Sequence, residues 1–172
     1  MKDLMFDLET LSLLPNAAIF QIGACYFDRH SGEIFESFLC NVDIQTTFNL
    51  GFKAHADTIY WWLNRSEKAR KGLVKDRIPI ESAIESFISF TLGTETIWCH
   101  KDFDYPILRN YFDVLKPSVQ IDYRRIYDIR TLTGLAKFDH RKLLREGIHH
   151  DALDDCIHQA KYCATCINLL GL

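Results

Sequence analysis

The chain has 172 residues, a length that fits one domain with one hydrophobic core, and we expect residues 1–172 to form a single domain. Its net charge of −3 argues against a protein that holds nucleic acid by broad electrostatic attraction alone. No apolar run approaches the roughly 20 residues that span a bilayer, and the acidic start is unlike a signal peptide. We therefore expect a cytoplasmic protein without a membrane partner.

Two acids stand out in the first ten residues, which otherwise form an apolar run. Asp7 and Glu9 are two positions apart, so on a strand both carboxylates face the same way, about 6.6 Å apart along the strand. Like charges on one buried face need a cation between them or raised pKa values. Hard divalent ions such as magnesium suit such a pair. A solvated strand face is an equally good interpretation of these two residues alone.

The next elements predict the start of a mixed sheet. Residues 10–17 contain a proline and should form a loop. Residues 18–28 and 33–42 are rich in strand-forming residues and are separated by a His-Ser-Gly turn, which predicts an antiparallel hairpin. We expect the first strand to lie centrally, because its carboxylates need elements on either side.

A helical region follows residues 46–57, which we leave as a loop. Helical spacing begins at Thr58, and residues 66–74 predict a second short amphipathic helix. Tyr60, Trp61 and Trp62 are three consecutive aromatic residues. One helix face cannot bury all three, so at least one should point into a groove or an interface.

The second half of the chain places further acids at the ends of elements. A helix from Pro79 to about Phe90 precedes a short buried strand at residues 96–100. Asp104 then stands at a strand-to-helix junction, where an acid can also be a simple helix cap. Residues 121–127 predict another strand, and residues 137–146 are basic, which suits either a solvated face or phosphate contacts.

The last helix should begin near Asp151, with Asp154 and Asp155 in its first turn. The six cysteines lie in apolar segments, as buried reduced thiols would. Cys163 and Cys166 form a C-x-x-C, but a zinc site is disfavoured because no second pair completes four ligands.

The order of these acids resembles the DEDDh group of 3'-5' exonucleases, which have a ribonuclease H-like fold. The resemblance covers essentially the whole chain, and its matching residues are Asp7, Glu9, Asp104, His150 and Asp155. It is closest to the phage and bacterial exoribonuclease-like branch, whose local motifs match residues 15–19, 22–24, 61–63 and 66–70. The resemblance implies an α/β fold with a mixed five-stranded sheet flanked by helices.

The resemblance also implies the chemistry. Asp7, Glu9, Asp104 and Asp155 would hold two Mg²⁺ or Mn²⁺ ions about 3.5–4 Å apart, and His150 would be the general base. The substrate would be the 3' end of single-stranded RNA or DNA, and the products nucleoside 5'-monophosphates. Candidates for phosphate contact and base stacking are Thr10, Trp61, Trp62, Arg141 and Lys142.

Two of the motif matches have an alternative residue assignment. The second motif is one residue shorter than usual and lacks an asparagine, so Asp102 is an alternative to Asp104. His149 with Asp154 also satisfies His-x4-Asp, although we prefer His150 with Asp155 because a small and an apolar residue then fall where the group has them. A binding module with a disabled site and a phosphodiesterase for very short oligonucleotides are the rival functions. Exposed aromatic residues and small size favour a homodimer as one possible assembly.

Overall fold

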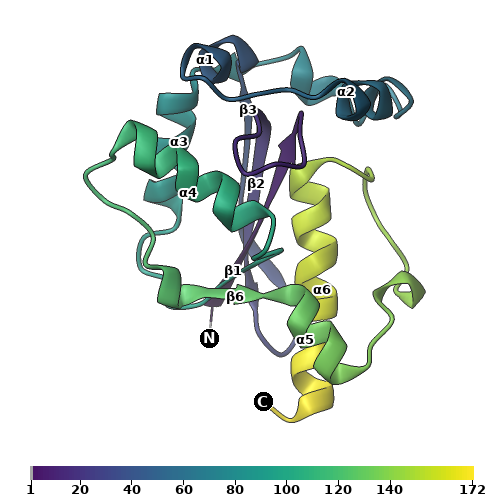
Figure 1. Cartoon of the computed structure of the whole chain (residues 1–172). Helices are drawn as coiled ribbons and strands as arrows, with labels where there is room; N and C mark the ends of the chain where they lie inside the picture. Colours follow the sequence, from purple (N-terminus) through teal and green to yellow (C-terminus); the bar gives the residue numbers. More distant parts are fainter. Residues whose placement is uncertain (1) are drawn as a thin grey trace.

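The first strand, β1 (Lys2–Thr10), runs through the middle of a mixed sheet, as expected (Figure 1). The structure is a computed structural model that describes residues 2–172. β1 pairs antiparallel with β2 (Ile19–Asp28) and parallel with β5 (Ile97–Cys99). β2 pairs antiparallel with β3 (Ile34–Val42), which confirms the predicted hairpin.

The sheet of the described residues has six strands, in the order β4-β3-β2-β1-β5-β6, where we expected five. The additional strand is β4 (Arg77–Ile78), which pairs parallel with the end of β3. Two residues are too short to carry a period-2 pattern, so this strand has no signal in the sequence. At the other edge, β6 (Ile126–Asp128) is shorter than predicted, because residues 123–125 form a 3-10 turn.

Helices cover both faces of the sheet (Figure 1). α3 (Ile80–Phe90) and α4 (Asp104–Leu115) lie on one face, and α6 (Ala152–Leu170) lies on the other, with α5 (Ile129–Ala136) packed against it. α2 (Ala56–Leu63) lies near the amino-terminal end of α6. Within residues 2–172 we find no helix with the length and apolar content needed to cross a membrane.

Two helix predictions between β3 and β4 were wrong. α1 (Ile44–Asn49) overlaps residues 46–57, which we left as a loop, and the Asp43 side chain caps it by accepting a hydrogen bond from the Gln45 backbone N–H. Residues 66–74 form turns and a 3-10 turn (Lys71–Leu73) instead of an amphipathic helix. Gly72 packs so closely on the side chains of Gln21 and Asn41 that tertiary contact, not helical propensity, decides this segment.

The two faces of β1 belong to different cores. Leu4, Phe6 and Leu8 point into the core formed with α3 and α4, whereas Met5 points into the core formed with α5 and α6. Because side chains alternate along a strand, Asp7 and Glu9 lie on the same face as Met5, toward α6. The apolar side chains therefore anchor the strand while its acids face one helix.

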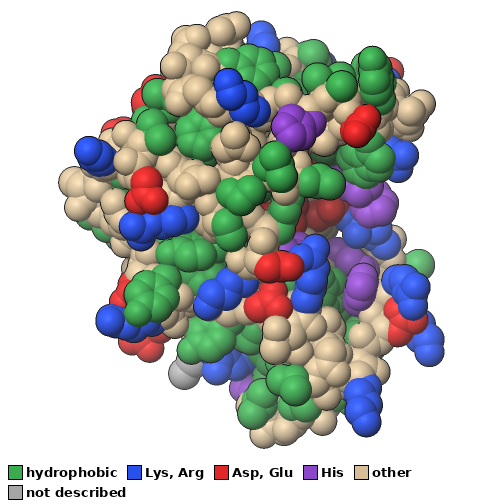
Figure 2. Space-filling model, in the orientation of Figure 1, with side chains coloured by type: hydrophobic (Ala, Val, Ile, Leu, Met, Phe, Trp, Pro, Cys, Tyr) green, Lys and Arg blue, Asp and Glu red, His purple; other side chains and the backbone are tan. Residues whose placement is uncertain are grey.

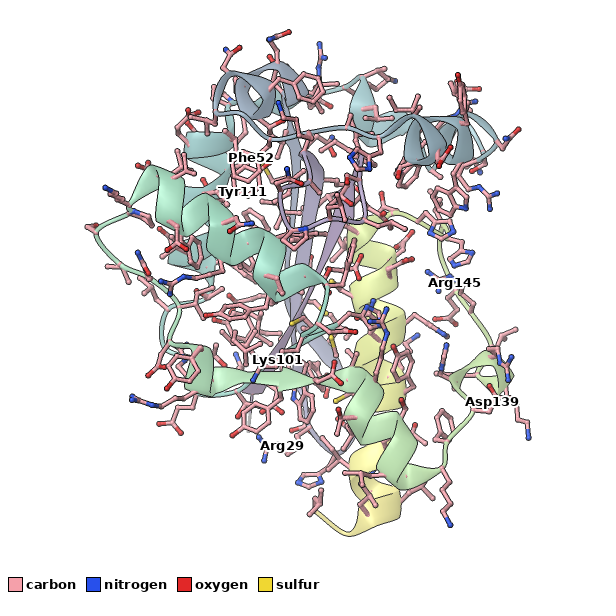
Figure 3. All side chains as sticks on the ribbon, viewed as in Figure 1. Arg29, Phe52, Lys101, Tyr111, Asp139 and Arg145 are labelled. Atoms are coloured by element: carbon pink, nitrogen blue, oxygen red, sulfur yellow. The ribbon has the colours of Figure 1, made fainter. Side chains whose placement is uncertain are left out.

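α6 packs directly on the backbone of β2. A Cβ atom added at Gly23 would lie 2.3 Å from the carbonyl carbon of Ala152, so the helix start touches the strand. The Ala152 backbone N–H donates to Gln21 Oε1 (2.9 Å), and Cys156 Sγ contacts the Gly23 carbonyl (3.3 Å). On the opposite face, the Tyr111 ring stacks on Phe52 at 3.6 Å (Figure 3). The contacts of Ala152 and Cys156 with β2 determine where the start of α6 lies relative to the sheet.

Candidate active site

The first two acids of the site come from the carboxyl end of β1. Asp7 and Glu9 are both buried, with 7% and 8% of their surface exposed. Gln159 of α6 donates from Nε2 to Asp7 Oδ1 at 2.8 Å. This bond ties the Asp7 side chain to α6.

Asp104, at the start of α4, is the third acid and is only 1% exposed. Its Oδ2 accepts a hydrogen bond from the His100 backbone N–H (2.8 Å), outside the helix, so the side chain does not cap α4. Asp102 instead lies at the surface in an ion pair with Arg130. Of the two alternatives in the second motif, Asp104 is the one that faces Asp7.

Asp155, in the first turn of α6, is the fourth acid. Carboxylate oxygens of Asp7, Glu9 and Asp155 all lie within 4.8 Å of one another, a spacing that a shared metal ion can bridge. Asp154 turns away, and its Oδ2 accepts a hydrogen bond from the Ile148 backbone N–H (2.6 Å). The helix therefore brings Asp155, and not Asp154, to the acids of β1.

Crowding of these carboxylates raises their proton affinity. Burial, followed by the nearby charges of Asp7 and Asp104, raises the pKa of Glu9 well above its usual value. Burial and the charge of Asp7 likewise raise the pKa of Asp104. Oδ1 of Asp104 is buried and accepts no hydrogen bond of normal geometry from any residue in 2–172, although the Leu8 backbone N–H faces this carboxylate. A site with this donor set fits divalent cations, which are stabilised by carboxylate oxygens.

One protein cation already occupies the site, and the sequence analysis did not single it out. Arg145, on the loop before α6, forms an ion pair with Asp155, and its charge also faces Asp7 and Glu9 (Figure 3). Burial lowers the pKa of this guanidinium. No spacing rule could have separated Arg145 from the other basic residues of a loop.

The two basic residues that we did select point elsewhere. Arg141 and Lys142 lie in the 3-10 turn His140–Lys142. Arg141 is exposed and bound to the carboxylate of Asp139 (2.8 and 3.1 Å), and Figure 3 shows Asp139 on the part of the loop beyond Arg145, away from the start of α6. The structure therefore does not bring these two residues together with the acids.

His150 lies beside Asp155 with its backbone in the left-handed region (φ 67°). Its backbone N–H donates to Asp155 Oδ1 (3.2 Å), and its ring stacks on His149 with centroids 3.8 Å apart. The ring also meets the Trp61 ring edge-on at 4.7 Å. Burial, with the neighbouring charge of His149, lowers the pKa of His150 to about 4, so the imidazole is neutral at pH 7.

A pocket of about 380 Å³ opens next to Glu9. Thr10, Trp61, Trp62 and Phe103 are among its lining residues. Trp62 is largely buried and donates from Nε1 to the Thr10 carbonyl (2.9 Å), whereas Trp61 is partly exposed. Figure 2 shows acidic side chains deep in a hollow of the surface, with His and Lys or Arg side chains along one side of it. Aromatic walls suit the stacking of a planar ring, and the acids beside them would accept a negatively charged group only through bound cations.

Comparisons with solved structures find the same fold in nucleases. The nuclease domain of 3'hExo, a DEDDh family member solved with rAMP, has a TM-score of 0.65 at 12% identity, with 97% of this chain and 92% of that chain covered. E. coli exonuclease I in complex with a dA16 oligonucleotide has a TM-score of 0.63 at 16% identity, with 97% of this chain and 40% of that chain covered. Cell-death related nuclease 4 (CRN-4) has a TM-score of 0.54 at 18% identity, with 97% of this chain and 64% of that chain covered. The chain thus spans less than two thirds of the last two proteins. A comparison with curated proteins finds no match.

These likenesses show that the molecule shares the fold of these nucleases. The family model described as the 3'-5' exoribonuclease Rv2179c-like domain matches residues 2–167. The chain belongs to this family.

Proposed function

We propose that this protein is a metal-dependent 3'-5' exonuclease that releases nucleoside 5'-monophosphates from the 3' end of single-stranded RNA or DNA. The observation that carries the proposal is the convergence of Asp7, Glu9, Asp104 and Asp155 from three separate elements. RNA is the first substrate to test, because the family is described as exoribonucleases. The structures of 3'hExo with rAMP and of exonuclease I with dA16 support a nucleic-acid end as the ligand.

The four carboxylates are the residues that would hold two Mg²⁺ or Mn²⁺ ions. When bound, such ions supply an activated nucleophile at neutral pH and stabilise the leaving oxygen. Gln159 orients Asp7 by its hydrogen bond, and the close packing of α6 on β2 keeps Asp155 near β1. Hydrophobic residues of both cores exclude water from behind the acids.

His150 is the proposed general base. A neutral imidazole can take the proton of the attacking water, and the charge of Asp7 favours the imidazolium that forms. The contact with Trp61 limits where the ring can turn. The terminal base of the substrate would enter the pocket lined by Thr10, Trp61 and Phe103. Arg141 and Lys142 remain candidates for phosphates farther along the strand.

We propose that residues 1–172 act as one exonuclease domain in the cytoplasm. A homodimer is the assembly that exposed aromatic residues such as Tyr60 favour. Sedimentation at several protein concentrations tests it, since a monomer at all concentrations would contradict a dimer.

The decisive experiment digests matched 20-nucleotide RNA and DNA strands, labelled at the 3' or the 5' end, in the presence of Mn²⁺. We expect labelled mononucleotide at once from 3'-labelled strands and a descending ladder from 5'-labelled strands. Asp7→Asn should abolish both, and His150→Ala should slow them by about 10²–10⁴-fold. Asp102→Asn is the matched control, because Asp102 lies near Asp104 in sequence but outside the cluster. A full rate for Asp7→Asn would refute the proposal.

A further inference from the structure

A tight turn joins β5 to α4 where the second motif is one residue short. The carbonyl oxygen of His100 accepts hydrogen bonds from the backbone N–H groups of Phe103 and Asp104, both at 2.8 Å. The His100 N–H donates in return to Asp104 Oδ2. These reciprocal bonds hold His100 and Asp104 together as a rigid unit at the carboxyl end of β5.

The turn places the imidazole of His100 over two of the acids. Its Nδ1 lies 3.8 Å from Asp7 Oδ1 and 3.8 Å from Asp104 Oδ2, and the three ligand atoms form a group within 4.8 Å. Both distances are too long for a hydrogen bond. They fall in the range between ligands of a common ion, which are about 3 Å apart when adjacent and about 4.2 Å apart when opposite at metal-to-ligand distances near 2.1 Å.

An independent observation points to a ligand at the same place. Asp104 is buried, yet within the described chain its Oδ1 makes no hydrogen bond of normal geometry, although the Leu8 backbone N–H also faces this carboxylate. A buried carboxylate oxygen left without a donor is costly, so it indicates a cation that is bound during function. The His100 side chain is only 23% exposed, and its Nδ1 lies 3.8 Å from Oδ2 of the same Asp104 carboxylate, so the ring is held beside this carboxylate instead of turning freely in water.

We propose that His100 Nδ1, with Asp7 and Asp104, is a ligand of one of the two divalent ions, and that this nitrogen makes the position prefer Mn²⁺ to Mg²⁺. The inference rests on the proposed function, because it concerns the same metal site. Imidazole nitrogen is a better ligand for first-row transition ions than for Mg²⁺, which prefers oxygen. The short second motif would then add a ligand instead of disabling the site.

The competing explanation is that a protonated His100 forms an ion pair with the two acids and never binds metal. Pulsed electron paramagnetic resonance on the Mn²⁺-loaded protein separates the two, because only a directly bound imidazole gives strong ¹⁴N modulation. We expect this modulation in the wild-type protein, and its replacement by a ¹⁵N pattern when histidine is ¹⁵N-labelled. The labelling experiment needs no mutation, so a folding defect cannot obscure it.

Variants assign the nitrogen to a residue. His100→Asn should lose the ¹⁴N modulation, because the backbone bonds of the turn remain while the ring is gone. His150→Ala should keep it. In competition binding, the ratio of the Mn²⁺ affinity to the Mg²⁺ affinity should fall at least about tenfold in His100→Asn. A change of this size is typical when one residue that tunes a metal site is lost.

Three results would overturn the inference: no nitrogen modulation in Mn²⁺-loaded wild-type protein, modulation that persists in His100→Asn, or an unchanged Mn²⁺ to Mg²⁺ preference in that variant. In each case Mn²⁺ still binds, and the proposed exonuclease function stands. Absence of any Mn²⁺ binding to the wild-type protein would instead defeat both proposals. The two failures are thus distinguishable by the Mn²⁺ titration alone.

Discussion

In the metal-free protein, the Arg145 guanidinium supplies positive charge among acids that would otherwise repel one another. The guanidinium pairs with Asp155 and faces Asp7, so a divalent ion bound by Asp155 must displace it. Strand alternation put Asp7 and Glu9 on one face, and the resemblance to DEDDh exonucleases implied that Asp104 and Asp155 join them. The sequence could not predict Arg145, since a loop has no periodicity from which to infer a direction.

Replacement of Arg145 by alanine should make the metal-free protein less stable and its response to metal larger. We expect a loss of about 1–2 kcal/mol in EDTA, between the values for exposed and buried ion pairs, or a few degrees in the melting temperature. Saturating Mn²⁺ should restore most of this loss. Arg141→Ala is the control, because Arg141 pairs only with exposed Asp139. An equal response to Mn²⁺ in both variants would contradict the displacement of Arg145.

At the scale of elements, the site depends on how closely α6 approaches β2. Gly23 has no side chain, which lets the backbone of Ala152 lie against the strand and brings Asp155 toward β1. The long elements were predicted from their apolar periodicity. α1 and β4 were not, because a capping bond from Asp43 and a two-residue pairing at the sheet edge decide them.

Gly23→Ala should displace the start of α6 and weaken metal binding. The added methyl group overlaps the backbone of Ala152, and we expect overpacking to cost about 1–3 kcal/mol of unfolding free energy. Calorimetric Mn²⁺ titration should show a clear loss of affinity. In Gly134→Ala, on α5, the new methyl group meets nothing within 4 Å, so affinity should not change. Wild-type Mn²⁺ affinity in Gly23→Ala would show that Asp155 does not depend on this contact.

In the molecule as a whole, the crowded acids of the site lower the stability of the metal-free fold and provide the ligands for a metal ion. Glu9 and Asp104 have raised pKa values when folded, so the folded protein keeps protons that the unfolded chain releases above about pH 4–5. Raising the pH therefore favours unfolding through these two groups. His150 acts in the opposite direction between its folded pKa of about 4 and its usual value of 6.5.

Asp104→Asn isolates the acid contribution in metal-free protein. Its unfolding free energy in EDTA, measured by urea denaturation, should increase relative to that of the wild type as the pH rises from 5 toward 8. The contribution of His150 is common to both proteins and cancels in the difference. Saturating Mn²⁺ should reverse the order at pH 8, since the variant lacks one ligand. Parallel stability curves in EDTA would mean that Asp104 has an ordinary proton affinity.

All six cysteines are buried, and burial raises the pKa of Cys25 to about 12 and that of Cys40 to about 11. The native cysteines should therefore react only slowly with thiol-reactive dyes. A single cysteine introduced at exposed Leu144, next to Arg145, would take a fluorophore alone. The emission of that label could then follow the loop in real time as ions and oligonucleotides arrive.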